Sequence, residues 1–107
     1  MWKVINDVKL QMAKGDYGIQ LPVSVEGVTV TEHDSLRFSF VDQKSKNSIL
    51  VKDYNIIQNN TVMLEFTKTE SDLFVVGYYL YSLDWYQDGN FMCNLIEDET
   101  FKVVDKV

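Results

Sequence analysis

Apolar and polar residues alternate along most of this chain, which is the two-residue period of a strand that buries one face. Residues 8–12 and 19–25 show this alternation on either side of an interruption at Lys14-Gly15-Asp16. Pro22 cannot donate a hydrogen bond to a neighbouring strand, so we expect its strand to lie at a sheet edge or to pair irregularly there. The first quarter of the chain therefore predicts two strands.

The same period predicts further strands at residues 28–30, 36–40, 49–54, 61–66, 78–86, 91–96 and 101–104. The polar residues 43–48 predict a solvent-exposed loop, and Asn59-Asn60 predicts a tight turn. Asp88-Gly89 between two apolar runs is typical of a β-hairpin, and we expect an acidic turn at residues 97–99. Residues 67–73 interrupt the alternation with good capping residues, which predicts one short helical turn.

These elements predict one all-β domain over residues 1–107. A length of 107 residues is usual for a single domain, and a chain of this size buries about two-thirds of its surface on folding. Short strands, roughly seven to nine of them, with turns about every ten residues, are more typical of a Greek-key β-sandwich than of a barrel.

Charge and composition narrow the choice of partners. Sixteen acidic and ten basic residues give a formal net charge of −6, and the lysines are scattered along the sequence. Such a surface repels phosphate groups, so we expect neither nucleic acid nor an anionic membrane as a partner, and the charge serves mainly solubility. The sequence has no signal-peptide pattern and no apolar run of transmembrane length, so we expect neither export by a signal peptide nor membrane insertion.

No group of residues in the sequence predicts catalysis, a cofactor or a metal site. His33 is the one histidine and Cys93 the one cysteine, so an internal disulfide and multi-cysteine metal motifs are excluded, and no nucleophile-elbow pattern occurs. Calcium would need Asp88 and residues 97–99 together, but a hairpin places them at opposite ends of one strand. We therefore expect a protein that binds or assembles and is not an enzyme.

The aromatic strand at residues 78–86 is a candidate interaction surface. Alternation places four residues on the core face, Tyr79, Tyr81, Leu83 and Trp85. It places Tyr78 and Tyr86 on the opposite face. Exposed tyrosines stack on sugar rings or anchor protein partners, although aromatic cross-strand pairs also simply stabilise sheets. Both interpretations of Tyr78 and Tyr86 stay open at this point.

The N-terminal run at residues 4–12, which includes Leu10, carries little charge and no proline. If it lies at a sheet edge, it is poorly protected and can add to a neighbouring copy or to a larger protein by strand augmentation. The alternative is internal pairing with the closing strand at residues 101–104.

The C-terminal half carries Val76-Gly77-Tyr78-Tyr79-Leu80-Tyr81, the Asp88-Gly89 hairpin and Phe101-Lys102-Val103-Val104. Together with Lys14-Gly15-Asp16, it resembles the small immunoglobulin-like domain at the N-terminus of baseplate upper proteins from tailed phages of Gram-positive bacteria. The resemblance implies an immunoglobulin-like sandwich in which Tyr78 or Tyr79 occupies the corner where the chain crosses between sheets.

Larger members of that family continue into further domains, whereas this sequence ends shortly after its last expected strand. The resemblance therefore implies a stand-alone phage or prophage structural protein, found in the virion or the bacterial cytoplasm. Its expected partners are other tail or baseplate proteins or further copies of itself, and cell-surface carbohydrate is the alternative ligand.

Overall fold

The computed structural model describes residues 3–5, 9–18, 21–24, 34–55 and 61–105. Within them the chain forms eight strands and one short helix: β1 Lys3–Ile5, β2 Lys9–Ala13, β3 Leu21–Ser24, β4 Asp34–Asp42, β5 Ser48–Tyr54, β6 Thr61–Leu64, α1 Lys68–Ser71, β7 Gly77–Gln87 and β8 Asn90–Val104. The predicted all-β class and strand number are confirmed. The expected strand at residues 28–30, the turn at Asn59-Asn60, and His33 lie outside the described residues.

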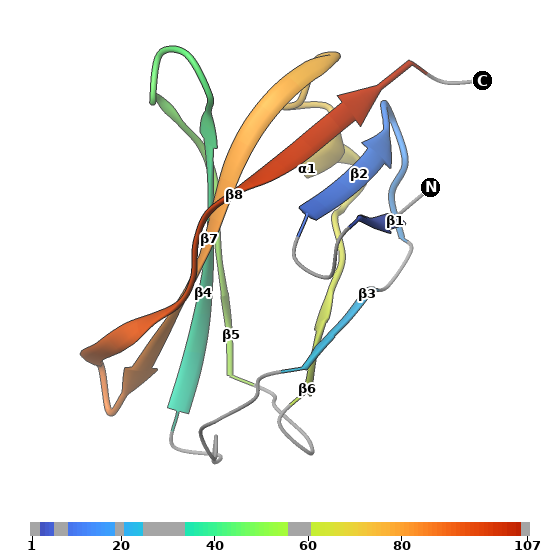
Figure 1. The fold of residues 1–107 in the computed structure, drawn as a ribbon. Coiled ribbons are helices and arrows are strands. Elements are labelled where there is room, and N and C mark those ends of the chain that lie inside the picture. The colour runs from blue at the N-terminus through green and yellow to red at the C-terminus, as the bar shows by residue number, and fades with distance from the viewer. Residues whose placement is uncertain (1–2, 6–8, 19–20, 25–33, 56–60, 106–107) are drawn as a thin grey trace.

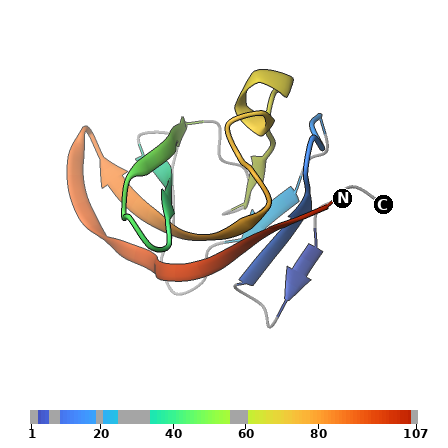
Figure 2. The same cartoon turned by 90° about the horizontal axis from the view of Figure 1, so that it is seen from above.

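The strands form two sheets (Figure 1). The large sheet has the order β1-β2-β8-β7-β4-β5, and the small sheet pairs β3 with β6. All neighbours are antiparallel except β2 and β8, which run parallel. Seen from above, the large sheet curls around the core and the small sheet lies on the open side of the curl (Figure 2). The fold is therefore sandwich-like, and Pro22 lies in a strand with a single described neighbour, as predicted.

The core follows from the alternation on two neighbouring strands. Every second residue of β4 is buried from Asp34 to Phe40, and β7 buries Tyr79, Tyr81 and Leu83 on the same side. The rings of Phe66, Phe74 and Phe101 meet that of Phe40 edge-on from β8 and from the chain between β6 and β7. Trp85 packs at the margin of this cluster. The predicted faces of residues 78–86 are thus confirmed.

The N-terminal run forms two strands in place of the single one expected. β2 lies between β1 and β8, and Leu10 to Ala13 pair with Phe101 to Val104. Leu10 is only 4% exposed and Met12 is fully buried, because both side chains fill the core beside β8. Internal pairing is therefore the alternative that the structure shows. Leu10 contributes nothing to the surface, and the edge strand on this side is β1.

The expectation of an acidic turn at residues 97–99 is wrong, because β8 continues through these residues. Tyr81 pairs with Glu99 and Leu83 with Ile96, so two residues of β8 lie opposite Ser82. This extra residue is a β-bulge, and Asp98 takes a positive φ of 47° there. A bulge accommodates a polar interruption without ending the strand, which the sequence pattern does not distinguish from a turn.

The short-range signals for the helix and the hairpin are confirmed. At α1 the Thr67 hydroxyl accepts a hydrogen bond from the Glu70 backbone, and the Glu70 carboxylate accepts one from the Thr67 backbone, which is a capping box. Asp88 and Gly89 have φ values of 50° and 82°, the positive values that a tight two-residue hairpin turn requires. No helix in the described part of the chain has the length and apolar character needed to cross a bilayer.

Candidate functional site

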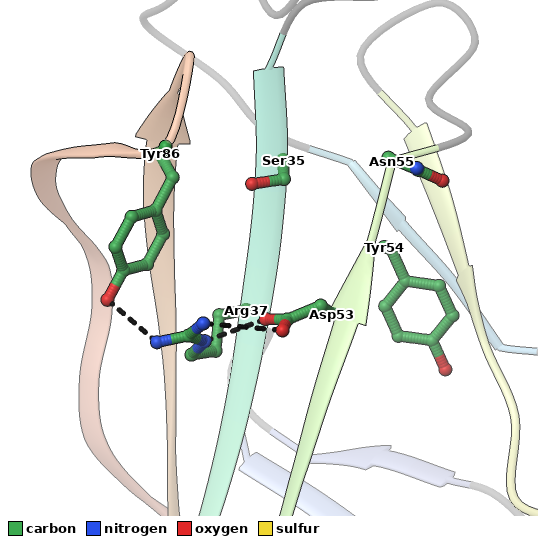
Figure 3. Close-up of a pocket in the computed structure, with 7 residues that line it drawn as sticks. Ser35, Arg37, Asp53, Tyr54, Asn55 and Tyr86 are labelled. Atoms are coloured by element: carbon green, nitrogen blue, oxygen red, sulfur yellow. Dashed lines mark hydrogen bonds and ion pairs between the residues drawn. The ribbon is translucent and has the colours of Figure 1, made fainter.

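A groove of about 380 Å³ lies on the outer face of the large sheet. Strand alternation turns Ser35 and Arg37 of β4 outward, since Leu36 and Phe38 point into the core. The pairing of β4 with β5 and β7 then places Asp53 and Tyr86 beside them. Residues at the ends of the strands complete the lining (Figure 3). The residues that line the groove are Ser35, Arg37, Asp53, Tyr54, Asn55, Tyr86 and Gly89.

Arg37 is held at the centre of this groove by two neighbours. Its Nε and Nη2 atoms donate to the two carboxylate oxygens of Asp53 at 2.7 and 3.3 Å, and its Nη1 donates to the Tyr86 hydroxyl at 3.2 Å. The hydrogen bond and charge of Asp53 raise the pKa of Arg37 above its ordinary value. A guanidinium has five N–H donors, so these contacts leave two for a ligand.

Tyr86 is oriented from both sides. The Arg37 guanidinium carbon lies 4.7 Å from the centre of the Tyr86 ring, and the Phe91 ring meets it edge-on at 5.7 Å. Phe91 itself is 55% exposed. Tyr86 is therefore a preoriented aromatic group with an exposed neighbour, the arrangement that binding surfaces use.

The groove is equipped for hydrogen bonding. The Arg37 and Asp53 charges compensate each other, and Ser35, Asn55 and Tyr86 add neutral donors and acceptors. Among the described residues that line it, there is no histidine, cysteine or lysine beside a nucleophile. Over residues 3–5, 9–18, 21–24, 34–55 and 61–105, no group of three or more His, Cys, Asp or Glu side chains is placed to hold a metal ion. A neutral polar ligand suits this chemistry best.

A second surface lies at the start of β7. Leu73, Val75, Val76 and Tyr78 are 49%, 64%, 46% and 53% exposed, and we call these four residues the apolar end. Lys102 lies over the Tyr78 ring at 5.4 Å from its centre, and the β4–β5 turn approaches it, since the Gln43 backbone donates to the Tyr78 carbonyl. Clustered exposed apolar side chains of this kind mark interaction sites more often than isolated ones do.

Buried Tyr79 fixes the shape of the apolar end. Its hydroxyl donates to the Val75 carbonyl at 2.8 Å and accepts from the Val75 backbone N–H at 2.9 Å. The chain crosses here from β6 and α1 to β7, so Tyr79 occupies the corner role that the resemblance assigns to Tyr78 or Tyr79. With its backbone anchored in this way, Val75 keeps its side chain in solvent.

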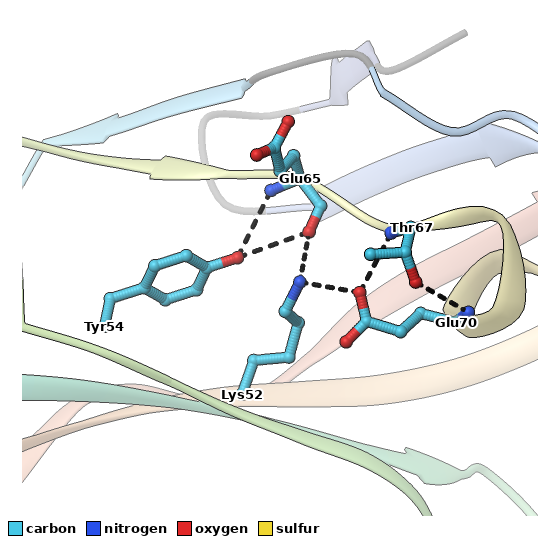
Figure 4. Close-up of polar contacts among 5 residues, drawn as sticks. All are labelled: Lys52, Tyr54, Glu65, Thr67 and Glu70. Atoms are coloured by element: carbon cyan, nitrogen blue, oxygen red, sulfur yellow. Dashed lines mark hydrogen bonds and ion pairs between the residues drawn. The ribbon is translucent and has the colours of Figure 1, made fainter.

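Lys52 connects the outer edge of the large sheet to the opposite layer (Figure 4). Its ammonium donates to the Glu65 carbonyl and to the Glu70 carboxylate, the latter at 2.8 Å, while the Tyr54 hydroxyl contacts the Glu65 backbone. Burial alone lowers the pKa of Lys52, but the hydrogen bond to Glu70 and the nearby Tyr54 outweigh it and raise the pKa overall. This network holds β5, and with it Asp53 of the groove, in place.

The structure separates the two tyrosines that the sequence grouped together. Tyr86 lines the groove and Tyr78 lies at the far end of the same strand, about 27 Å away at the usual rise per residue. The sequence pattern does not indicate Arg37 and Asp53 as site residues, because only the register of β4 against β5 brings them together. Cys93 is half-buried on β8 opposite Trp85.

Comparison of the chain with protein-family models, with curated proteins and with solved structures finds no match. The resemblance to phage baseplate proteins therefore rests on the sequence motifs alone.

Proposed function

We propose that this chain is a non-catalytic structural protein of a tailed phage or prophage, which acts in a tail or baseplate through contacts with other proteins. The apolar end carries this proposal. Four large apolar side chains stand exposed within six residues, on backbone that Tyr79 anchors, and a fixed apolar cluster favours a protein partner. The tail or baseplate setting comes from the sequence resemblance.

The test is incorporation into particles. Tail particles purified from an induced lysogen that carries the gene should contain the chain by mass spectrometry, and its absence would overturn the proposal. The double variant Val75→Asp/Val76→Asp should fold but fail to incorporate. Val51→Asp is the matched control, because Val51 is similarly exposed at 49% but lies on β5, away from the apolar end. Equal incorporation of both variants would reject the apolar end as the contact.

Carbohydrate binding is the second candidate function, and the groove favours it. A compensated ion pair, an aromatic ring and amide and hydroxyl groups surround a space of about 380 Å³, and such planar polar groups hydrogen-bond to sugar hydroxyls. Tyr78 supplies the control, since it is the same residue type on the same strand but outside the groove. Tyr86→Ala should weaken binding to cell-wall polysaccharide about tenfold or more, and Tyr78→Ala should leave it unchanged. No binding to any polysaccharide or on a glycan array would remove this candidate.

A further inference from the structure

The Arg37 guanidinium offers a ligand one defined edge. Its Nε and Nη2 atoms donate side by side to the two carboxylate oxygens of Asp53, at 2.7 and 3.3 Å, and its Nη1 donates to the Tyr86 hydroxyl at 3.2 Å. One N–H of Nη1 and one of Nη2 are left without an acceptor among the described residues. Because the guanidinium is planar, these two donors lie in one plane, and Asp53 and Tyr86 fix its orientation.

The charges around this edge favour a neutral ligand. Asp53 of β5 and Asp84 of β7 are the register partners of Arg37 on its two sides, so two carboxylates flank one guanidinium. The Asp84 carboxylate accepts a hydrogen bond from the Asn94 side chain, which leaves its negative charge in place. A ligand that carries a carboxylate or phosphate group is therefore repelled, and an uncharged oxygen atom is the acceptor that suits Arg37.

Neutral polar groups surround the rest of the groove (Figure 3). Arg37 and Asp53 lie at one end of it. Beyond them Ser35 lies between Tyr86 on one side and Asn55 on the other. The Ser35 hydroxyl and the Asn55 side-chain amide form no hydrogen bond with another described residue. Both groups are therefore available to a ligand that binds beside Arg37.

An acetamido group matches these features. Its carbonyl oxygen has two lone pairs in the plane of the amide, and these accept from two N–H donors that lie in one plane. Its N–H needs an acceptor, and the Ser35 hydroxyl, two residues from Arg37 on the same face of β4, supplies one. Its methyl group packs on an aromatic side chain, and Phe91 beside Tyr86 is 55% exposed. A sugar hydroxyl at the same position has neither the planar carbonyl nor the methyl group.

We propose that the groove binds a sugar that carries an acetamido group, with the carbonyl oxygen on the free edge of Arg37 and the amide N–H on Ser35. This inference rests on carbohydrate binding, the second candidate function, and names the class of sugar. The volume of about 380 Å³ is near the lower end of the range of about 300–1,000 Å³ for small-molecule sites, so a short oligosaccharide suits it. A peptide amide is a poorer match, because β4 is an interior strand and leaves no open edge with which a peptide strand can pair.

The experiment is calorimetric titration of the full chain with chitotriose and with cellotriose. These neutral trisaccharides have the same linkage and differ only in an acetamido group against a hydroxyl on each ring, and we expect chitotriose to bind about tenfold or more tightly. Arg37→Lys keeps the positive charge but loses the planar pair of donors, so it should remove this preference. Ser35→Ala should weaken chitotriose binding about fivefold or more. Ser39→Ala is the matched control and should leave binding unchanged, because Ser39 lies on the same face of β4 but does not line the groove.

Circular dichroism and a cooperative melt should show that the variants fold, and the two trisaccharides on the unmodified chain decide the inference even where a variant does not. Equal binding of both trisaccharides, or tighter binding of cellotriose, would overturn the acetamido inference and leave carbohydrate binding standing. A preference for chitotriose that persists in Arg37→Lys would overturn the contact with Arg37. Binding of N-acetyl-trialanine amide as tight as that of chitotriose would assign the groove to peptides instead. No binding of any polysaccharide or trisaccharide would remove the carbohydrate function, and this inference with it.

Discussion

Phe40 is the residue whose replacement should damage the fold most. It is fully buried, and its ring centre lies 5.4 Å from that of Phe66, 5.7 Å from Phe74 and 5.3 Å from Phe101. Phe66 and Phe74 belong to the chain between β6 and β7, and Phe101 belongs to β8. Phe40→Ala therefore opens a cavity at the point where the two layers of the sandwich meet.

The expected cost is large relative to the stability of the whole chain. Truncating a buried phenylalanine to alanine costs about 3–5 kcal/mol, whereas the typical stability of a domain with 107 residues is about 5–16 kcal/mol. Phe91→Ala is the matched control. Phe91 is 55% exposed and, among the described residues, has a single ring neighbour, Tyr86, so its truncation should cost about 0.5–1 kcal/mol.

Urea unfolding followed by tryptophan fluorescence measures both costs, because Trp85 packs against the core. The midpoint should fall strongly for Phe40→Ala and slightly for Phe91→Ala, with an unchanged slope against urea. If Phe40→Ala shows no cooperative transition, Phe40→Leu gives a milder version of the same perturbation. A cost for Phe40→Ala below about 1 kcal/mol, or equal to that of Phe91→Ala, would refute the central role of this ring cluster.

Three further predictions test the polar anchors and the bulge. Burial alone raises the pKa of Glu70, but hydrogen bonds from Lys52 and the Thr67 backbone hold this pKa below its ordinary value of 4.5. The ionised Glu70 carboxylate therefore stabilises the fold fully above that pH, and this stabilisation is lost as the pH falls. Glu70→Gln should therefore lose less stability than the unmodified chain between pH 6 and pH 3 in urea titrations. Asp98→Val places a β-branched residue at a φ of 47° and should lower the free energy of unfolding by about 1–2 kcal/mol, whereas Asp98→Gly should be nearly neutral. Tyr79→Phe removes both hydrogen bonds to Val75 and should cost about 1–3 kcal/mol in the same assay, with no effect expected for the exposed Tyr78→Phe.

Most of the strands could be predicted from the sequence because their buried faces are regular. Leu36, Phe38 and Phe40 alternate with polar residues, and the alternation alone assigns them to the core. The Asp88-Gly89 turn and the Thr67 cap are local too, since each depends on backbone conformations that few residues favour. Signals of this kind lie within a few residues of one another and do not depend on how the sheets assemble.

The groove could not be predicted, because its residues meet only through register. Arg37 lies 16 residues from Asp53 and 49 from Tyr86 along the chain, and a shift of one residue in either pairing would turn these side chains into the core. The parallel pairing of β2 with β8 is equally non-local. It brings Leu10 beside Phe101, so a run that looks like an unprotected edge in the sequence is an interior strand in the structure.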